Sequence, residues 1–228
     1  MSASLILYVD HVSQPARALS LLCRAIGVSH QEKFINLMKG EHMTKDYAAV
    51  NPFKKIPAVK DGNTLLLESC AALRYISSKY DTSGKWYPQD LDVRCKVDEY
   101  LDWQHLNTRA HGMGYFRNSL LLPVLKKTIP DKSVVNGHKK ELGRIGRDFE
   151  KYFLGSKPFI SCDHVTIADL LAACEFEQPL AAGYDWQDPV ISFIQRVKSE
   201  IGPEYDKVHS SMRELTKSLS EKLAARAV

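Results

Sequence analysis

Three short motifs early in the chain stand at junctions where a helix or a strand begins, and two of them carry polar side chains. Ser13 follows the apolar run SLILYVD and precedes a helical pattern, Glu68-Ser69 occupy a second such junction, and Ile56-Pro57 open a strand. The N-terminus of a helix presents free N–H groups and a partial positive charge, which favour a carboxylate ligand. The Glu68 side chain could pair with an ammonium group. These residues therefore predict a site for the –NH3+ and –COO− groups of an amino acid.

The segment around Pro57 adds a second set of contacts. Proline has no N–H, so a cis bond at Ile56-Pro57 is possible and would present the backbone of Ile56 to a ligand. Lys54, Lys55 and His42 could meet a second carboxylate. A peptide with an amino-acid head and a distant carboxylate would suit this set. A purely structural use of Ser69 as a helix cap and of Pro57 in the strand remains open.

The elements that carry these residues read β-α-β-α-β-β-α. Short apolar runs predict strands, the turn dipeptide Asp61-Gly62 predicts a hairpin, and apolar spacing predicts helices, the first of which ends at Gly27. Ser69 is the predicted N-cap of the last helix. This order implies a mixed sheet covered by helices. The expected ranges are strands 4–10 and 30–38, a hairpin within 56–68, and helices 14–26, 43–50 and 69–80.

After a Gly- and Pro-containing loop at 81–90 the strand signals end. We therefore expect a first domain over 1–81 and an all-helical domain over 90–228. Thr166 as N-cap with Asp169 at N3 has the form of a capping box, to which we assign a folding role. The helical ranges are 91–117, 131–153, 166–182, 187–201 and 204–224.

Composition narrows the function classes. The 228 residues are 44% hydrophobic and 25% charged, as in globular proteins, and the net charge of +4 is spread along the chain rather than gathered in a nucleic-acid-binding block. The five cysteines form no CxxC motif and indicate free thiols in a reducing compartment. The N-terminus has neither a signal peptide nor a membrane span, so we expect a cytoplasmic protein that does not bind membranes.

The ordered motifs VSQPARAL, KGEH, NPFKKIPAVKDG, LLESCAALRYI and VTIADL resemble those of the glutathione S-transferases, and of their theta class in particular, over nearly the whole chain. The resemblance implies an α/β thioredoxin-like N-terminal domain, an all-α C-terminal domain and a homodimer. It also implies a detoxification enzyme that conjugates glutathione, as co-substrate, to small hydrophobic electrophiles such as alkyl halides and epoxides. Peroxide reduction is a further implied activity. No metal or other cofactor is implied.

The same resemblance assigns roles to individual residues. Ser13 resembles the family's catalytic serine, whose hydroxyl donates to the glutathione sulfur and stabilises the thiolate. The other residues that the resemblance places against glutathione are His42, Met43, Lys55, Ile56, Glu68, Ser69, Asn107 and Arg109.

Alternatives to this assignment stay open. Ser13 could only cap the helix, Tyr8 is a rival hydroxyl donor, and Arg17 could add positive charge nearby or serve as a solvated or structural arginine. Tyr115 and Phe116 suit either the electrophile pocket or the core. A non-catalytic binding module of the same fold is the alternative function.

Two further readings concern the helical part. His105 and His111 have no third ligand at metal spacing, so we expect no zinc site. The amphipathic C-terminal segment could cover the active site or pack on the surface.

Overall fold

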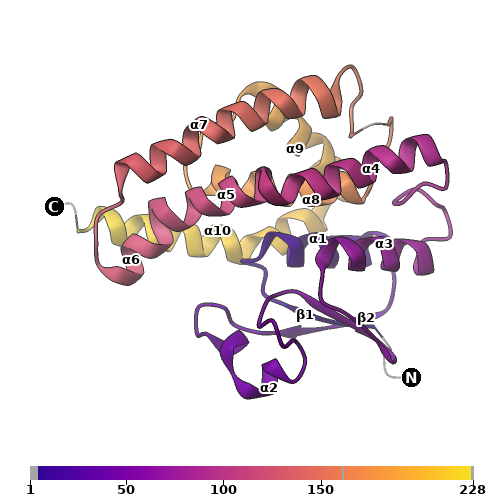
Figure 1. The fold of residues 1–228 in the computed structure, drawn as a ribbon, viewed down its shortest axis with the longest axis horizontal. Helices are drawn as coiled ribbons and strands as arrows, with labels where there is room; N and C mark the ends of the chain where they lie inside the picture. The colour runs from indigo at the N-terminus through magenta and orange to yellow at the C-terminus, as the bar shows by residue number, and fades with distance from the viewer. Residues whose placement is uncertain (1–4, 161, 227–228) are drawn as a thin grey trace.

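The structure is a computed structural model that describes residues 5–160 and 162–226. Residues 5–80 form a four-stranded sheet with three helices, and helices make up most of the chain from residue 91 onward. Figure 1 shows α1 and α3 lying between the sheet and the helical part, whereas α2 covers the opposite face of the sheet. The two parts therefore share one layer of helices.

The sheet has the strand order β2-β1-β3-β4. β1 pairs in parallel with β2 and antiparallel with β3, and β3 forms a hairpin with β4. This order confirms the predicted mixed sheet, and with the helices that follow it confirms the α/β-plus-all-α fold class. The elements of this part are β1 (Leu5–Val9), α1 (Gln14–Ala25), β2 (His30–Phe34), α2 (Lys45–Ala48), β3 (Ala58–Asp61), β4 (Thr64–Leu66) and α3 (Ser69–Tyr80).

Alternation along β1 explains why both faces of the sheet are covered. Side chains of a strand point alternately to opposite faces. Leu7 and Val9 are buried in the main core, whereas Tyr8 lies in a separate cluster with Tyr47 and Ala58. The Tyr8 ring meets the Tyr47 ring edge-on, with centroids 6.2 Å apart. Tyr8 therefore belongs to the face that α2 covers.

The helical part packs on α1 chiefly through α8. All residues of α1 from Gln14 to Cys23 are buried, as expected of a helix that lies between a sheet and another helix layer. The helices of this part are α4 (Leu91–Trp103), α5 (Thr108–Phe116), α6 (Leu122–Lys126), α7 (Lys132–Asp148), α8 (Ile167–Ala181), α9 (Asp188–Ile201) and α10 (Pro203–Ala224).

The capping box that starts α8 is confirmed. The Thr166 side chain accepts from the N–H of Ala168, and the Asp169 carboxylate accepts from the N–H of Thr166 at 2.8 Å. The carboxylate also accepts from the N–H of Ile160 at 2.7 Å. Asp169 thus fixes both the start of α8 and the chain before it, in keeping with the predicted folding role.

Two local predictions are wrong. The second strand ends at Phe34 rather than at residue 38, because the backbone donors after Ile35 go to carboxylates: Asn36 N–H donates to Glu41 and Leu37 N–H to Asp10. The N-cap of α3 is Glu68, which is extended, and Ser69 is the first helical residue.

No helix within residues 5–160 and 162–226 is both long enough and apolar enough to cross a membrane.

Candidate functional site

A cavity of about 620 Å³ lies between the two parts of the chain. Its lining divides into two walls that differ in chemistry. The sheet-side wall consists of Val12, Ser13, Leu37, Met38, His42 and Lys54–Ile56. The helix-side wall consists of Met113, Phe116, Arg117, Leu121, Leu122 and Leu125.

Ser13 stands at the N-terminus of α1 on the sheet-side wall. Its backbone has the extended conformation of an N-cap, yet its side chain makes no capping hydrogen bond. The hydroxyl is 3.4 Å from the Ile56 carbonyl oxygen, which is long for an O–H···O hydrogen bond. The side chain is buried and lines the cavity. A hydroxyl that is not committed to the helix is free to donate to a bound group there.

The loop before Ser13 is held in place by Arg17, which is fully buried. Its guanidinium donates to the carbonyls of His11 at 2.7 Å and Val12 at 3.2 Å. The same group donates to the carbonyl of Cys174 and the Oε1 atom of Gln178 on α8, each at 2.9 Å. Arg17 is therefore a structural arginine, not a solvated one, and it joins the Ser13 loop to the helical part.

Burial lowers the pKa of Arg17, while the nearby Cys174, Glu177 and Glu175 act in the opposite direction. The cost of desolvating a cation is offset when its N–H groups are hydrogen-bonded. Four acceptors around one guanidinium supply that compensation and fix its orientation. The position of Ser13 thus depends on residues more than 150 positions away in sequence.

The Lys54–Ile56 segment is fixed by two side chains that share one acceptor. Tyr47 Oη and Asn51 Nδ2 each donate to the Lys55 carbonyl at 2.8 Å. Lys54 has a left-handed backbone conformation, with φ of 53°, and the Ile56-Pro57 bond is cis, as considered from the sequence. These contacts hold the Ile56 backbone beside Ser13, and Lys54 and Lys55 are among the residues that line the cavity.

His42 reaches the cavity from a short 3-10 helix, Glu41–Met43. Its Nδ1 atom is buried without a hydrogen-bond partner among the described residues. An unpaired buried nitrogen is costly unless a ligand completes it. Met43 is 57% exposed and does not line the cavity.

Glu68 and Ser69 lie at the N-terminus of α3 and are not among the residues that line the cavity. Ser69 is buried and Glu68 is exposed. The Glu68 side chain makes no capping hydrogen bond to α3, so the first N–H groups of the helix receive no side-chain cap from it. This junction retains the features that predicted an amino-acid head group.

The structure does not bring Asn107 and Arg109 to the cavity. Arg109 Nε forms an ion pair with Glu175 at 2.8 Å, and the Glu175 side chain is fully buried. Burial raises the pKa of Glu175, which Arg109 partly offsets. Asn107 accepts from Arg144 at 2.9 Å and donates to the Trp103 carbonyl. Their contact with a ligand stays a prediction.

The helix-side wall is largely apolar and comes from one stretch of chain. It begins in α5, passes through a wider π-helical turn at Arg117–Leu121 and ends in α6. α10 supports it from behind, since Leu219 is buried in one cluster with Phe116 and Leu120. Phe116 lines the cavity, whereas Tyr115 packs edge-on against Tyr184 in the core.

Sequence reasoning missed most of this wall. Met113, Arg117 and Leu125 belong to an ordinary amphipathic pattern, and periodicity does not say which face meets a cavity. α10 packs behind the wall, and within the described residues none of its side chains lines the cavity.

Tyr8 is not a rival to Ser13. It lies in the cluster under α2 and lines a different, smaller cavity of about 310 Å³. The alternation along β1 puts its ring on the face of the sheet away from α1. Of the two hydroxyls considered, only the one of Ser13 faces the cavity between the two parts.

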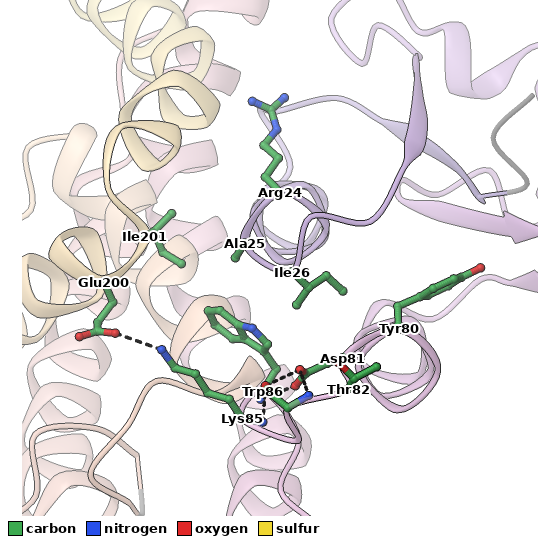
Figure 2. Close-up of a pocket in the computed structure, with 11 residues that line it drawn as sticks. Arg24, Ala25, Ile26, Tyr80, Asp81, Thr82, Lys85, Trp86, Glu200 and Ile201 are labelled. Carbon is green, nitrogen blue, oxygen red and sulfur yellow. Dashed lines mark hydrogen bonds and ion pairs between the residues drawn. The ribbon is translucent and has the colours of Figure 1, made fainter.

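A second cavity between the two parts of the chain, of about 550 Å³, lies at the C-terminal end of α1 (Figure 2). Its charged groups are already paired. Lys85 Nζ lies 3.2 Å from Glu200, Arg24 binds Glu204 at 2.7 Å, and Asp81 accepts from the N–H of Trp86. This cavity therefore offers few unsatisfied polar groups to a ligand, in contrast to the one beside Ser13.

Within the described ranges no three His, Cys, Asp or Glu side chains are grouped to hold a metal ion. His111 instead meets His138, with their Nδ1 atoms 3.4 Å apart. His105 lies against Cys70, at 3.6 Å from its sulfur.

Comparison with known proteins assigns this architecture. Residues 4–78 match the family model described as "Glutathione S-transferase, N-terminal domain". The chain is 37% identical over 200 residues to mouse glutathione S-transferase theta-3, which covers 86% of this chain and 83% of the relative. It is 35% identical over 199 residues to human glutathione S-transferase theta-1, with the same coverage.

Solved structures agree. The apo form of human glutathione-S-transferase T1-1 matches with a TM-score of 0.90 and 32% identity, covering 97% of each chain. Human glutathione transferase theta-2, in complex with glutathione and an unknown ligand, matches with a TM-score of 0.90 and 33% identity, covering 96% of this chain and 91% of that one.

Proposed function

Because this chain belongs to the glutathione S-transferases and is a theta-class glutathione transferase, we propose that it conjugates glutathione to small electrophiles with the Ser13 hydroxyl stabilising the thiolate. The observation that carries the proposal is the Ser13 hydroxyl, which is buried at the cavity, makes no bond to its own helix and has only a long 3.4 Å contact with the Ile56 carbonyl. The interdomain cavity would hold the reacting groups of both substrates.

In the proposed reaction the bound thiol first loses its proton to solvent. The thiolate then attacks an electrophilic carbon, for example that of an alkyl halide. A carbon–sulfur bond forms while the carbon–halogen bond breaks, and the halide leaves with the bonding electron pair. Ser13 forms no covalent bond: its O–H donates to sulfur throughout. Epoxides would react similarly by ring opening, and peroxide reduction would be a related use of the thiolate.

The energies are adequate for this role. A free cysteine-type thiol has a pKa of about 8.5, and lowering it by about two units requires about 2.7 kcal/mol of preferential thiolate stabilisation. A hydrogen bond to a charged group contributes about 1.5–3 kcal/mol. The N-terminus of α1 adds about 0.3–1 kcal/mol. One hydroxyl and one helix terminus are therefore sufficient.

We place glutathione along the sheet-side wall and the adjoining end of α3. Glu68 and Ser69 would hold the γ-glutamyl group, the Ile56 backbone would pair with the cysteinyl part, and His42 and Lys55 would meet the glycyl carboxylate. The unpartnered Nδ1 of His42 supports this orientation. Met43 would lie beside the glycyl end, and any contact from Asn107 or Arg109 would be additional.

The two substrates would be bound by different parts of the chain. Residues 1–81 would bind glutathione, and residues 90–228 would supply the electrophile site through the helix-side wall. We also propose a homodimer in the cytoplasm. The mass of the purified protein in solution tests the dimer directly.

The central test is Ser13→Ala, with Tyr8→Phe as its matched control. We expect Ser13→Ala to lower turnover of an alkyl halide by about 100-fold, the usual effect of removing one donor to a developing or stabilised anion. Calorimetry should still show glutathione binding, but the ultraviolet absorbance of the bound thiolate should be lost at neutral pH. Tyr8→Phe should keep both. Retention of thiolate absorbance and turnover by a folded Ser13→Ala protein would refute the assignment.

A further inference from the structure

The helix-side wall contains one charged side chain that the proposed binding of glutathione does not use. Arg117 lines the cavity among Phe116, Leu121 and Leu122. Within residues 5–160 and 162–226, no hydrogen bond or ion pair reaches its guanidinium. Two other arginines discussed above already have partners. Arg109 forms an ion pair with Glu175, and Arg17 donates to backbone carbonyls.

The charge balance of the cavity makes this arginine distinctive. The lining holds the cations of Lys54, Lys55 and Arg117 and no carboxylate. The two lysines stand on the sheet-side wall, where the glycyl carboxylate of glutathione would meet them. Arg117 belongs to the opposite wall, beside the space left for the electrophile, and its side chain is exposed and so accessible to a bound group.

The backbone at Arg117 departs from regular helix. Residues Arg117–Leu121 form a wider π-helical turn between α5 and α6. Such single turns are rare and occur often at functional sites, because the extra residue redirects the side chains around it. Here the turn adjoins a cavity wall of otherwise apolar side chains.

We infer that the electrophile site takes amphipathic electrophiles, with an apolar body against the helix-side wall and a carboxylate bound by Arg117. This inference rests on the proposed function and adds a substrate class to it. A carboxylate loses much free energy on leaving water unless a charged donor meets it. The planar guanidinium offers two parallel N–H donors that match a carboxylate. The carboxylate stays in the product, distant from the carbon that the thiolate attacks.

The test compares pairs of electrophiles that differ only in the terminal group: ω-bromoalkanoates of increasing length and the 1-bromoalkanes of the same chain length. The readout is the ratio of kcat/KM values for the two members of a pair at saturating glutathione. We expect Arg117→Met to lower this ratio about tenfold at the best chain length. Arg117→Lys should restore part of it, because the charge returns without the planar fork.

Lys126→Met is the matched control for charge. Lys126 is exposed at the end of α6 and does not line the cavity, so its removal changes the net charge equally without touching the wall. The ratio should stay as in the unaltered protein. An equal fall of both kcat/KM values in Arg117→Met, or a ratio that does not change, would overturn the inference.

A binding measurement separates this inference from the proposed chemistry. Calorimetry with two stable conjugates, S-hexylglutathione and S-(5-carboxypentyl)glutathione, requires no turnover and can be made in the Ser13→Ala background. We expect Arg117→Met to weaken the binding of the carboxylated conjugate about tenfold relative to the binding of the hexyl conjugate. Equal weakening of both conjugates, or of neither, refutes the role of Arg117 whatever the outcome for Ser13.

Discussion

The two walls of the cavity are built in opposite ways. On the sheet-side wall, loops are held by buried hydrogen bonds. Arg17 donates to the backbone before Ser13, and Tyr47 and Asn51 donate to the Lys55 carbonyl. On the helix-side wall, side chains project from one helical stretch that rests on apolar contacts with α10. The sheet-side wall therefore presents backbone groups at fixed positions. The helix-side wall presents only the shape and charge of its side chains.

In the proposed function, this difference would separate recognition of glutathione on the sheet-side wall from recognition of the electrophile on the helix-side wall. Backbone groups can be placed accurately only if the loops that carry them are fixed, and each fixing contact is costly to lose. Apolar side chains on a helix can be exchanged without moving the backbone. We therefore expect substitutions behind the sheet-side wall to affect both stability and glutathione use, and substitutions on the helix-side wall to affect the choice of electrophile.

The largest effect should come from Arg17→Met. The substitution leaves carbonyls of His11, Val12 and Cys174 without their buried donor, so we expect a loss of about 3 kcal/mol or more in the free energy of unfolding. Turnover should fall with it, because the Ser13 loop is no longer held. Denaturant unfolding and steady-state kinetics measure both.

Arg147→Met is the control for this variant, because Arg147 is exposed on α7 and its loss should cost less than about 0.5 kcal/mol. An Arg17→Met protein as stable and active as the control would remove the basis for treating the sheet-side wall as rigid.

Asn51→Ala should have an intermediate effect. Asn51 is fully buried; its Nδ2 donates to the Lys55 carbonyl and its Oδ1 accepts from the Phe53 N–H. We expect a loss of about 2 kcal/mol in stability and a several-fold rise in KM for glutathione. Tyr47→Phe should cost only about 1 kcal/mol, since the Lys55 carbonyl keeps its bond from Asn51. Equal KM values in both variants and the unaltered protein would separate this loop from glutathione binding.

The smallest effect on the fold should come from the helix-side wall. Leu125 lines the cavity and is 58% exposed, so Leu125→Ala should change stability by less than about 0.5 kcal/mol. The kcat/KM for an apolar electrophile should fall, because the variant loses about 1 kcal/mol of transition-state stabilisation. The KM for glutathione should stay constant. Ile129→Ala, 87% exposed and outside the lining, should change neither constant. A rise in KM for glutathione in Leu125→Ala would contradict the independence of the two walls.

Local patterns predicted the fold well. Apolar alternation, the Asp61-Gly62 turn and helical spacing gave the element order of the sheet part, and the Thr166 and Asp169 pair gave the start of α8. The errors arose where distant groups decide. Ile35, Leu37 and Met38 suit a strand, but carboxylates of Asp10 and Glu41 draw the backbone into a loop.

The site divides in the same way. Ser13, His42 and the Lys55-Ile56 segment are short-range motifs and could be named from the sequence. The role of Arg17 could not, because its acceptors Cys174 and Gln178 are remote in sequence. Arg117 also could not, because helical periodicity does not show which arginine faces a cavity.

The contacts of Arg17 also have a consequence for folding during synthesis. During synthesis the sheet part leaves the ribosome before α8 exists, and domains generally fold from the N-terminus onward. Until α8 docks, the Cys174 carbonyl and Gln178, half of the acceptors of the Arg17 guanidinium, are absent. A nascent chain that exposes only its first part therefore carries Ser13 before the contacts that hold its loop are complete, and the proposed chemistry would have to wait for α8.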